Sequence, residues 1–332
     1  MPKTRQWLLN AHPRGRPVKA DDFRLATAEI ASPADGELLL ATRYLGFDPA
    51  QKGWMENIAD YVAPMAIGDV MRGSAISEVI ESRHPGFVPG DQVVGTTGWT
   101  EYHLSDGAGI EKINTALPST AILSILGTTG LTAWCGLFKR GRPQPGDTVL
   151  VSGAAGATGS VVGQLARIAG ARAVGIAGGA EKCRWLVEEA GFDAAIDYRA
   201  PDLADQIRAE CPNGADVVFD NVGGRVLDAM LGQLATGARV VICGGISRNE
   251  TGGLPVGPSN YFNLVFRRAH MTGFIVLDWA AEFPAIRARL EQLVQAGRLN
   301  YREDIQEKFE NAPATLMRLF AGQNRGKQLL KL

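Results

Sequence analysis

The sequence predicts an α/β protein in which a mostly β region is followed by a region built on a parallel sheet. Residues 20–125 contain short alternating or β-branched runs that proline and glycine separate. From about residue 130 to 297 the pattern becomes strand, turn and helix, repeated. Strands that alternate with helices of ten or more residues are typical of βαβ units. At 332 residues, with 45% hydrophobic side chains, the chain is long enough for two domains.

The predicted elements follow one another along the chain. In the first region, GELLLATRYL (36–45) and DQVVGTTGWTEYHL (91–104) are the clearest strand runs. In the second region each apolar run leads into a helix or a loop: TVLVSG (148–153) precedes a helix over 157–170, AVGIAG (173–178) one over 180–190, DVVFDNVGG (216–224) one over 225–235, and RVVICGG (239–245) a loop and GFIVL (273–277). The last segment, from residue 300, predicts strand, helix, loop and strand. We expect that segment to complete the first domain.

Composition and charge exclude several classes of function. The formal net charge of -1 comes without a lysine- or arginine-rich block, which argues against nucleic-acid and membrane-surface partners. No apolar stretch approaches the roughly 20 residues that span a bilayer, and the N-terminal segment has no apolar signal-peptide region, so we expect a cytoplasmic protein. The four cysteines are widely spaced and form no CxxC pair. This spacing supports neither a disulfide framework nor a structural zinc site.

The stretch VLVSGAAGATGSVVGQLARIAG (149–170) contains a run of small residues between a strand and a helix. Its Ala154, Gly156 and Gly159 form an AxGxxG variant of the glycine-rich turn that binds dinucleotides. Such a turn lets the backbone approach a pyrophosphate, which the N–H groups of the helix N-terminus stabilise. Close packing of helix on strand is the alternative explanation. The position of the turn, between a strand and a helix in an alternating region, favours dinucleotide binding.

The end of the next predicted strand indicates which dinucleotide binds. An NAD-preferring site usually has an acidic residue about 20 residues after the glycine turn. Here Gly178 and Gly179 end the strand, and Lys182 follows in the helix. A 2′-phosphate would find space and a cation at this place, and Tyr198 supplies a hydroxyl after the following strand. The alternative is that Lys182 is only a solvated helix residue. The pattern favours NADP over NAD.

Several further motifs resemble one family in particular. They are YLGFDPAQKGWM (44–55), IGDVMRG (67–73), GWTEYHLSD (98–106), AAGATGSVVGQLA (154–166), FDNVGG (219–224), VICGGIS (241–247) and GFIVLDW (273–279). Their order and spacing resemble the medium-chain dehydrogenase/reductase superfamily. Within it they are similar to the zinc-independent branch of leukotriene B4 12-hydroxydehydrogenase, also called prostaglandin reductase or alkenal double-bond reductase. The resemblance extends over nearly the full length.

The resemblance implies a GroES-like β domain from residues 1–126 and 298–332, with a Rossmann doubly wound domain of residues 127–297 between them. It implies an active site in the cleft between the domains and a homodimer. For four of the residues below, a structural role is the alternative to cofactor binding: Asn221 and Asn324 as turn residues, and Cys243 and Phe274 as core residues. The residues that the resemblance places at the cofactor are Gly156, Ala157, Thr158 and Gly159 at the pyrophosphate, Lys182 and Tyr198 at the 2′-phosphate, and Asn221, Cys243, Gly244, Gly245, Ile246, Ser247 (in the loop 243–249), Phe274, Ile275, Val276 and Asn324 along the rest.

The sequence departs from zinc-dependent relatives of the family. Those relatives carry a GHE motif with metal-binding cysteine and histidine, whereas the matching region here reads RGSAISEVIES (72–82). None of the four histidines has another histidine or a cysteine at helical spacing, so we expect no metal site. Alcohol dehydrogenation would then lack its Lewis acid. Reduction of a conjugated C=C bond needs only a hydrogen-bond donor for the developing enolate and a source of protons.

Candidates for the residue that donates a hydrogen bond to the enolate lie before the GF-V motif. Mammalian and plant members have a tyrosine before the GF-V motif, and Phe266 stands at that place here. Tyr261, in GPSNYFNLVF, is the nearby phenol, and it is either the catalytic donor or a packing residue. Ala50 replaces a tyrosine of those relatives, and LGTTGLTAW (126–134) replaces a longer turn. The aromatic candidates for the wall of the substrate pocket, some of which must be core, are Tyr44, Trp54, Tyr61, Trp99 and Tyr102.

These observations predict an NADPH-dependent reductase of the C=C bond in α,β-unsaturated aldehydes or ketones, acting without zinc on a small apolar enone or enal. Quinone or carbonyl reduction on the same fold is the first alternative. A protein that binds NADPH without catalysis is the second, because the fold permits it.

Overall fold

The computed structural model describes residues 3–249 and 257–332. The chain divides into two compact units, which we call unit 1 and unit 2. Unit 1 comprises Met1–Leu123 and Glu303–Leu332, and unit 2 comprises Ser124–Arg302. The sequence predicts these divisions at residues 126 and 297.

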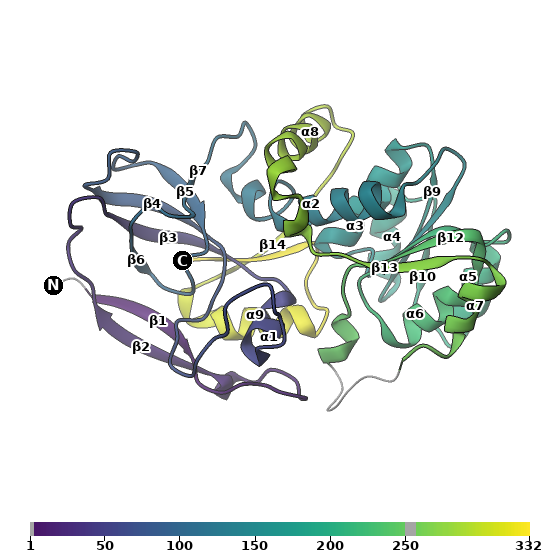
Figure 1. The fold of residues 1–332 in the computed structure, drawn as a ribbon, viewed down its shortest axis with the longest axis horizontal. Helices are drawn as coiled ribbons and strands as arrows, with labels where there is room; N and C mark the ends of the chain where they lie inside the picture. Colours follow the sequence, from purple (N-terminus) through teal and green to yellow (C-terminus); the bar gives the residue numbers. More distant parts are fainter. Residues whose placement is uncertain (1–2, 250–256) are drawn as a thin grey trace. The chain divides into compact units, whose positions relative to one another are not determined.

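Unit 1 is built on a mostly antiparallel sheet of seven strands in the order β14-β15-β3-β4-β5-β7, with β6 paired to β3, and on a separate two-stranded sheet β1-β2. Only the pair β14-β15 of these is parallel. Figure 1 shows the two sheets of this unit. The elements are β1 Lys3–Leu9, β2 Phe23–Glu29, β3 Leu38–Gly46, α1 Ala50–Glu56, β4 Ala75–Ser82, β5 Gln92–Gly95, β6 Tyr102–Ser105, β7 Glu111–Lys112, β14 Glu303–Glu307, α9 Ala312–Phe320 and β15 Lys327–Lys331.

The two ends of the chain meet within unit 1, as the sequence predicts for the last segment. Strand β15 pairs antiparallel with β3, where Leu330 lies opposite Leu45. Both side chains are fully buried in one core that also contains residues of α9. The apolar run of β3 is therefore buried by partners from distant parts of the sequence.

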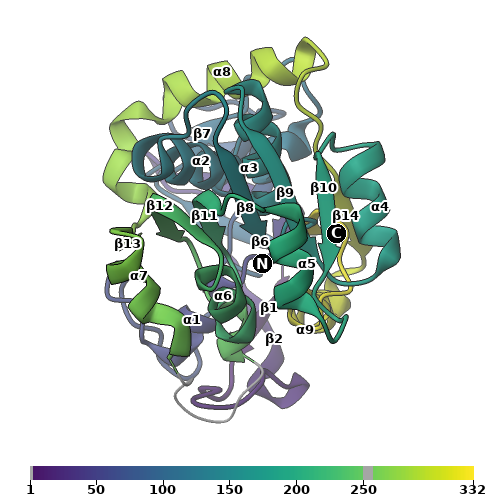
Figure 2. The same ribbon diagram turned by 90° about the vertical axis from the view of Figure 1, so that its right-hand side faces the viewer.

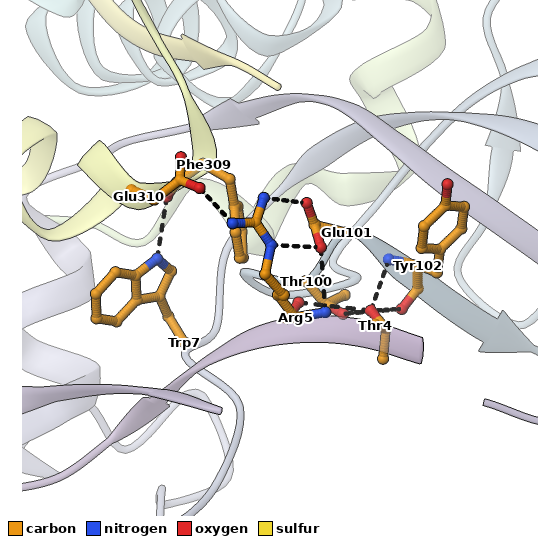
Figure 3. Close-up of polar contacts among 8 residues, drawn as sticks. All are labelled: Thr4, Arg5, Trp7, Thr100, Glu101, Tyr102, Phe309 and Glu310. Atoms are coloured by element: carbon orange, nitrogen blue, oxygen red, sulfur yellow. Dashed lines mark hydrogen bonds and ion pairs between the residues drawn. The ribbon is translucent and has the colours of Figure 1, made fainter. Parts of the chain in front are cut away.

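A network of polar contacts joins β1, the segment before β6 and the segment before α9 (Figure 3). The Arg5 guanidinium donates to the Glu101 carboxylate at 2.5 and 2.9 Å and also contacts Glu310. The hydrogen bonds to Glu101 are the largest cause of an Arg5 pKa well above its ordinary value. The Trp7 indole N–H donates to the carbonyl of Phe309 (3.0 Å). These contacts hold the return segment against the N-terminal strand.

The helix α1 is an element that the sequence pattern of a mostly β region does not predict. It begins after Pro49, whose fixed φ suits a helix start, and it ends at Asn57 in the left-handed conformation. Lys52 pairs with Glu56 one turn later at 2.9 Å, and both side chains are buried. Charges that are buried in this way need their partners, so loss of either one would be costly.

Unit 2 contains a six-stranded parallel sheet in the order β10-β9-β8-β11-β12-β13. This is the strand order of the doubly wound dinucleotide-binding fold, which confirms the predicted fold class. The elements are α2 Thr128–Cys135, β8 Thr148–Ser152, α3 Ala157–Ile168, β9 Arg172–Ala177, α4 Ala180–Glu188, β10 Ala194–Asp197, α5 Leu203–Glu210, β11 Ala215–Asp220, α6 Gly224–Leu231, β12 Leu234–Ile242, α7 Asn263–Phe266, β13 His270–Gly273 and α8 Phe283–Gln295.

Helices cover both faces of the parallel sheet. Figure 2 shows α2, α3 and α8 on one side and α5 and α6 on the other. Buried side chains of α5 and α6 form one core with the strands, as between Ile207, Met230 and Val218. Because the sheet is covered on both faces, its strands are continuous apolar runs. No helix in the described part of the chain combines the length and the hydropathy that crossing a membrane requires.

One predicted strand is misplaced by a few residues. The sixth strand is β13, which ends at Gly273, whereas the sequence predicts a strand over GFIVL (273–277). After Gly273 the chain leaves the sheet, and a 3-10 helix spans Val276–Glu282. The Phe274 ring packs closely on Gly136, since a Cβ atom on Gly136 would lie only 2.6 Å from that ring. The apolar character of this run therefore reflects packing after the strand rather than pairing within it.

Candidate functional site

The predicted cofactor residues of unit 2 gather at the carboxyl ends of its parallel strands. The strands β8, β9, β11 and β12 all point to the same edge of the sheet. In open parallel sheets this edge, near the point where the strand order reverses, is where ligands bind. The segments that follow these strands there are Gly153–Gly159, Gly178–Lys182, Asn221–Gly224 and Cys243–Ser247.

The glycine-rich turn joins β8 to α3. Gly156 is the N-cap of α3 and has no side chain to cap the helix, and within the described residues no side-chain acceptor binds the N–H groups of Ala157, Thr158 and Gly159. A Cβ atom on Gly159 would lie 2.4 Å from the Gly153 carbonyl oxygen. Helix packing thus requires glycine at position 159. The backbone N–H groups of an uncapped first turn can bind an anion. Both helix packing and ligand binding therefore explain the small residues of this turn.

The turn after β9 meets the residue that follows β10. A Cβ atom on Gly178 would lie 2.8 Å from the Tyr198 ring and 3.1 Å from its hydroxyl oxygen. Gly179 has a φ of +94°, which other residues rarely adopt, and it is the N-cap of α4. Lys182 stands in the first turn of α4 and is half-buried. The predicted pair, Tyr198 and Lys182, therefore adjoins the same glycine turn.

Two arginines at this turn are functional candidates that the sequence reasoning missed. The Arg225 guanidinium lies 5.7 Å from the centre of the Tyr198 ring and donates to the Tyr198 carbonyl (2.7 Å). The Arg199 Nη1 lies 3.3 Å from the position of a Cβ atom on Gly179. Arg199 follows Tyr198 directly in the sequence, which was an available signal. Arg225 opens α6, and only the fold brings it to Tyr198.

Asn221 links the turn after β11 to β8. Its backbone N–H donates to the Ser152 Oγ (2.8 Å), and its side-chain Nδ2 donates to the Ser152 carbonyl (2.7 Å). The Asn221 carbonyl accepts from the N–H of Ile246 at 3.2 Å. The Ser247 hydroxyl donates to the Val222 carbonyl (2.6 Å). The turn role is therefore present in the structure, and it joins the loops that carry Asn221 and residues 243–247.

Cys243 begins the loop after β12. Its N–H donates to the Asp220 carbonyl at 2.8 Å. Burial raises the pKa of its thiol to about 12, so the thiol stays protonated at neutral pH. Gly244 and Gly245 follow, and a Cβ atom on Gly244 would lie 3.4 Å from the Asn221 carbonyl oxygen. The two loops approach one another closely.

The segment after β13 is only partly buried. The Phe274 ring lies 5.9 Å from the Trp279 ring, between centroids. Ile275 is exposed and Val276 begins the 3-10 helix. The Phe274 side chain is half-buried, and its ring packs against Gly136 at the end of α2.

Tyr261 lies on a 3-10 helix, Ser259–Phe262, that leads into α7. Its side chain is 57% exposed, and that of Phe266 is 63% exposed. Within residues 3–249 and 257–332 the Tyr261 hydroxyl has no hydrogen-bond partner, and its ring contacts Phe262 edge to face at 6.4 Å. The alternative of a buried packing role does not fit this exposure.

Six predicted site residues lie in unit 1. Trp99 is 0% exposed, with its indole stacked on Phe23 (5.3 Å between ring centres), so it belongs to the core rather than to a pocket wall. Tyr44 packs on a small apolar cluster of unit 1. Trp54 donates its indole N–H to the Tyr61 hydroxyl at 3.3 Å. Tyr102 is exposed on β6. The buried Asn324 donates its amide to the Gly326 carbonyl (2.7 Å), which is a turn contact.

The histidines show no metal-binding arrangement. His12 Nδ1 lies 2.5 Å from the Met55 carbonyl oxygen, and His84 Nδ1 accepts from the Gly86 N–H at 2.9 Å. Burial lowers the pKa of His103. Among the residues that the structure describes, no three His, Cys, Asp or Glu side chains are grouped so as to hold a metal ion.

Comparison with known proteins places the chain among oxidoreductases. A family model described as the N-terminal domain of oxidoreductase matches residues 5–113, and one described as zinc-binding dehydrogenase matches residues 157–292. The NADPH-dependent curcumin reductase of Escherichia coli is 39% identical over 99% of this chain and 97% of that protein. Prostaglandin reductase 1 of Bos taurus is 37% identical over the whole of both chains.

A solved structure is similar over nearly the full length. The crystal structure of CurA in complex with NADPH from Vibrio vulnificus has 39% sequence identity, and it covers 98% of each chain with a TM-score of 0.92. The similarity therefore extends over both regions that the family models match, residues 5–113 and 157–292. The fold, the glycine-rich turns of unit 2 and the sequence relationship thus all indicate an oxidoreductase.

Proposed function

Since this chain belongs to the zinc-independent branch of the medium-chain dehydrogenase/reductase family, we propose that it uses NADPH to reduce the C=C bond of α,β-unsaturated aldehydes or ketones. The names of the full-length relatives, a curcumin reductase and a prostaglandin reductase, support this proposal. The observation that carries the cofactor assignment is the turn after β9. There Gly178 adjoins Tyr198, Arg225 of α6 contacts Tyr198, and Lys182 lies in the first turn of α4.

The residues of unit 2 fit NADPH in three respects. The uncapped first turn of α3 offers backbone N–H groups to a pyrophosphate. Gly178 and Gly179 let Tyr198 and Arg199 approach the backbone of this turn, because a Cβ atom would lie 2.8 Å from the Tyr198 ring and 3.3 Å from the Arg199 Nη1. Lys182 lies in the first turn of α4, shortly after these glycines, and a charge-assisted contact to a 2′-phosphate contributes about 1.5–3 kcal/mol. We assign the pyrophosphate to Gly156–Gly159 and the 2′-phosphate to Lys182 and Tyr198.

NADPH, when bound, supplies the hydride that the β-carbon of the enone receives. The chain must then stabilise negative charge on the carbonyl oxygen and deliver a proton. Tyr261 has a hydroxyl without a partner among the described residues, and we propose that it donates a hydrogen bond to that oxygen. Trp54 and Tyr61, which contact one another, offer aromatic surface for an apolar substrate.

We also propose that the protein is a homodimer. Strand β13 is the last strand of the sheet in unit 2 and pairs on one side only within the described chain. An unpaired edge of this kind is a template for another strand, and a two-fold axis lets the same edge pair with itself. Exposed apolar side chains accompany it. They are Tyr261, Phe262, Val265, Phe266, Met271, Ile275 and Leu277, which we call the edge patch.

The proposal is tested by measuring NADPH oxidation with a matched pair of acceptors, a linear enone and a benzoquinone. We expect turnover with the enone and a saturated ketone as the product. Turnover with the quinone alone would support quinone reduction instead. NADPH binding without turnover of any acceptor would support a non-catalytic protein.

A further inference from the structure

The carboxyl ends of β8 and β11 are joined by a buried pair of polar side chains. The Ser152 hydroxyl donates to the Asp220 carboxylate at 2.6 Å. Both residues are 0% exposed. They are the last residues of two adjacent parallel strands, at the edge where the predicted cofactor segments begin.

The Asp220 carboxylate organises the turn that follows β11. Its oxygens accept from the backbone N–H of Val222 (3.1 Å) and of Gly223 (2.9 Å). Its own carbonyl accepts from the N–H of Cys243 (2.8 Å) and of Gly244 (3.1 Å). One residue therefore fixes the turn after β11 and the start of the loop after β12.

Ser152 connects the same turn to β8. Its Oγ donates to Asp220 and accepts from the N–H of Asn221 at 2.8 Å, while its carbonyl accepts from the Asn221 side chain. The glycine-rich turn starts at the next residue, Gly153. Three of the segments assigned to the cofactor are thus tied to two buried side chains that do not themselves face solvent.

Within the described residues, the Asp220 carboxyl is held by hydrogen bonds from Ser152, Val222 and Gly223. No lysine, arginine or histidine in the described part of the chain forms an ion pair with it, and burial raises its pKa while the Ser152 and backbone donors lower it. A carboxylate accepts at both oxygens, whereas the amide of asparagine presents a donor at one of them. The substitution Asp220→Asn would therefore place an NH2 group against an N–H or O–H donor.

We propose that Asp220 and Ser152 are positioning residues of the cofactor site. They hold Asn221, the loop of residues 243–247 and the glycine-rich turn in the arrangement that NADPH needs, without touching NADPH themselves. This inference rests on the proposed function. It predicts that weakening the pair loosens the cofactor more than it changes the chemical step.

Strand β11 offers a matched control at its other end. Asp216 lies near the start of β11, and its Oδ2 accepts from the N–H of Thr148 at the start of β8 (2.9 Å). This contact also joins a carboxylate of β11 to a residue of β8. It lies at the amino ends of the strands, away from the predicted cofactor segments.

The experiment compares Asp220→Asn, Ser152→Ala and Asp216→Asn with the wild-type protein. NADPH binding is measured by the change in nicotinamide fluorescence, and KM and kcat are measured with one enone. Thermal unfolding reports the stability of each variant. We expect Asp220→Asn to weaken NADPH binding roughly 10- to 100-fold, as loss of hydrogen bonds to a charged group does. We expect Ser152→Ala to weaken it less, and kcat at saturating NADPH to change less than about 3-fold in both.

Asp216→Asn should lower the unfolding temperature while NADPH binds as in the wild type. If Asp220→Asn does not fold, Ser152→Ala decides the outcome, since it removes a small side chain only. Wild-type NADPH affinity in Ser152→Ala and Asp220→Asn, or an equal loss in Asp216→Asn, would overturn the inference and leave the proposed function standing. Absence of NADPH binding to the wild-type protein would contradict both.

Discussion

Lys182 stands at the N-terminal turn of α4, beside the glycine turn that adjoins Tyr198. If it binds the 2′-phosphate, Lys182→Ala should weaken NADPH by about 10- to 100-fold, which corresponds to one charge-assisted contact. NADH has no 2′-phosphate and should lose little. The measurement is kcat/KM for both cofactors with one enone.

Arg184, exposed two residues further along the same helix, provides the control for Lys182. Arg184→Ala removes a similar charge from α4 but from a different side of the helix, because successive residues turn by about 100°. It should leave the preference for NADPH unchanged. Equal losses for NADPH and NADH in Lys182→Ala would remove Lys182 from the 2′-phosphate site.

Tyr261 is the residue proposed to donate a hydrogen bond to the substrate carbonyl. Removal of one preorganised donor lowers turnover by roughly 100- to 1000-fold at comparable sites. Tyr261→Phe should therefore lower kcat more than it raises KM, because the bond strengthens as the enolate forms. The measurement is steady-state kinetics with one small enone at saturating NADPH.

Phe266→Tyr is the companion variant, since the family resemblance implies a tyrosine at that place in mammalian and plant members. In the wild-type background it should leave kcat unchanged or raise it, and in the Tyr261→Phe background it should restore part of the loss. A near-wild-type kcat for Tyr261→Phe would exclude Tyr261 from catalysis. Water or a ribose hydroxyl would then supply the proton.

At the scale of single residues, sequence alone could indicate which side chains carry the cofactor chemistry but not their neighbours. Gly178, Lys182 and Tyr198 follow strand ends in an alternating pattern, and parallel strands bring such ends to one edge. Arg225 is brought to Tyr198 by the packing of α6, for which no local pattern exists. Trp99 is aromatic in a candidate motif, yet it is buried entirely.

At the scale of elements, α3 depends on a glycine that the ligand does not explain. A Cβ atom on Gly163 would lie 1.9 Å from the ring of the buried Phe192. Alanine favours a helix over glycine by about 0.5–1 kcal/mol, but overpacking costs about 1–3 kcal/mol. Gly163→Ala should therefore destabilise the protein by a net amount of about 1–2 kcal/mol in urea unfolding.

The Phe192 ring would cause the clash in Gly163→Ala, so a smaller side chain at position 192 should relieve it. Phe192→Leu alone should destabilise, because it leaves a cavity. Gly163→Ala together with Phe192→Leu should cost less than the sum of the two single changes. Additive losses would show that Gly163 is needed for another reason.

The helices of unit 2 were predictable because their apolar spacing is clear, and their ends differ from prediction by a few residues. The helix predicted over 180–190 ends at Glu188, and that predicted over 225–235 ends at Leu231. The run GFIVL was not correctly placed, since apolar residues of a short run fit a strand or a packed turn equally well. The helix α1 has only seven residues and lies between strands, so its pattern is too short to detect.

At the scale of the whole molecule, the edge patch predicts association of two copies. Wild-type protein should elute as a dimer in light-scattering chromatography. Met271→Glu combined with Val265→Glu places charge on the patch and should give a monomer, since both side chains are exposed there. Val187→Glu, an exposed apolar position on α4, is the control and should remain dimeric. A monomeric wild type would contradict the proposal.

The change in texture along the sequence predicts two domains with a return of the last segment to the first, and the structure divides into Met1–Leu123 with Glu303–Leu332 and Ser124–Arg302. The partner of that segment was not predictable from pattern. Leu330 pairs with Leu45 across most of the sequence, and no local rule selects one strand edge over another. The family resemblance implies that both chain ends build one domain, but it does not say which strands pair.

Isotope labelling of the transferred hydride tests directly whether the protein reduces the C=C bond of an enone. The protein is given NADPH carrying deuterium at the transferable position of the nicotinamide, together with a linear enone, and the product is analysed by NMR. Hydride transfer to the β-carbon would give a saturated ketone with deuterium on that carbon. An allylic alcohol with deuterium on the carbonyl carbon would contradict it.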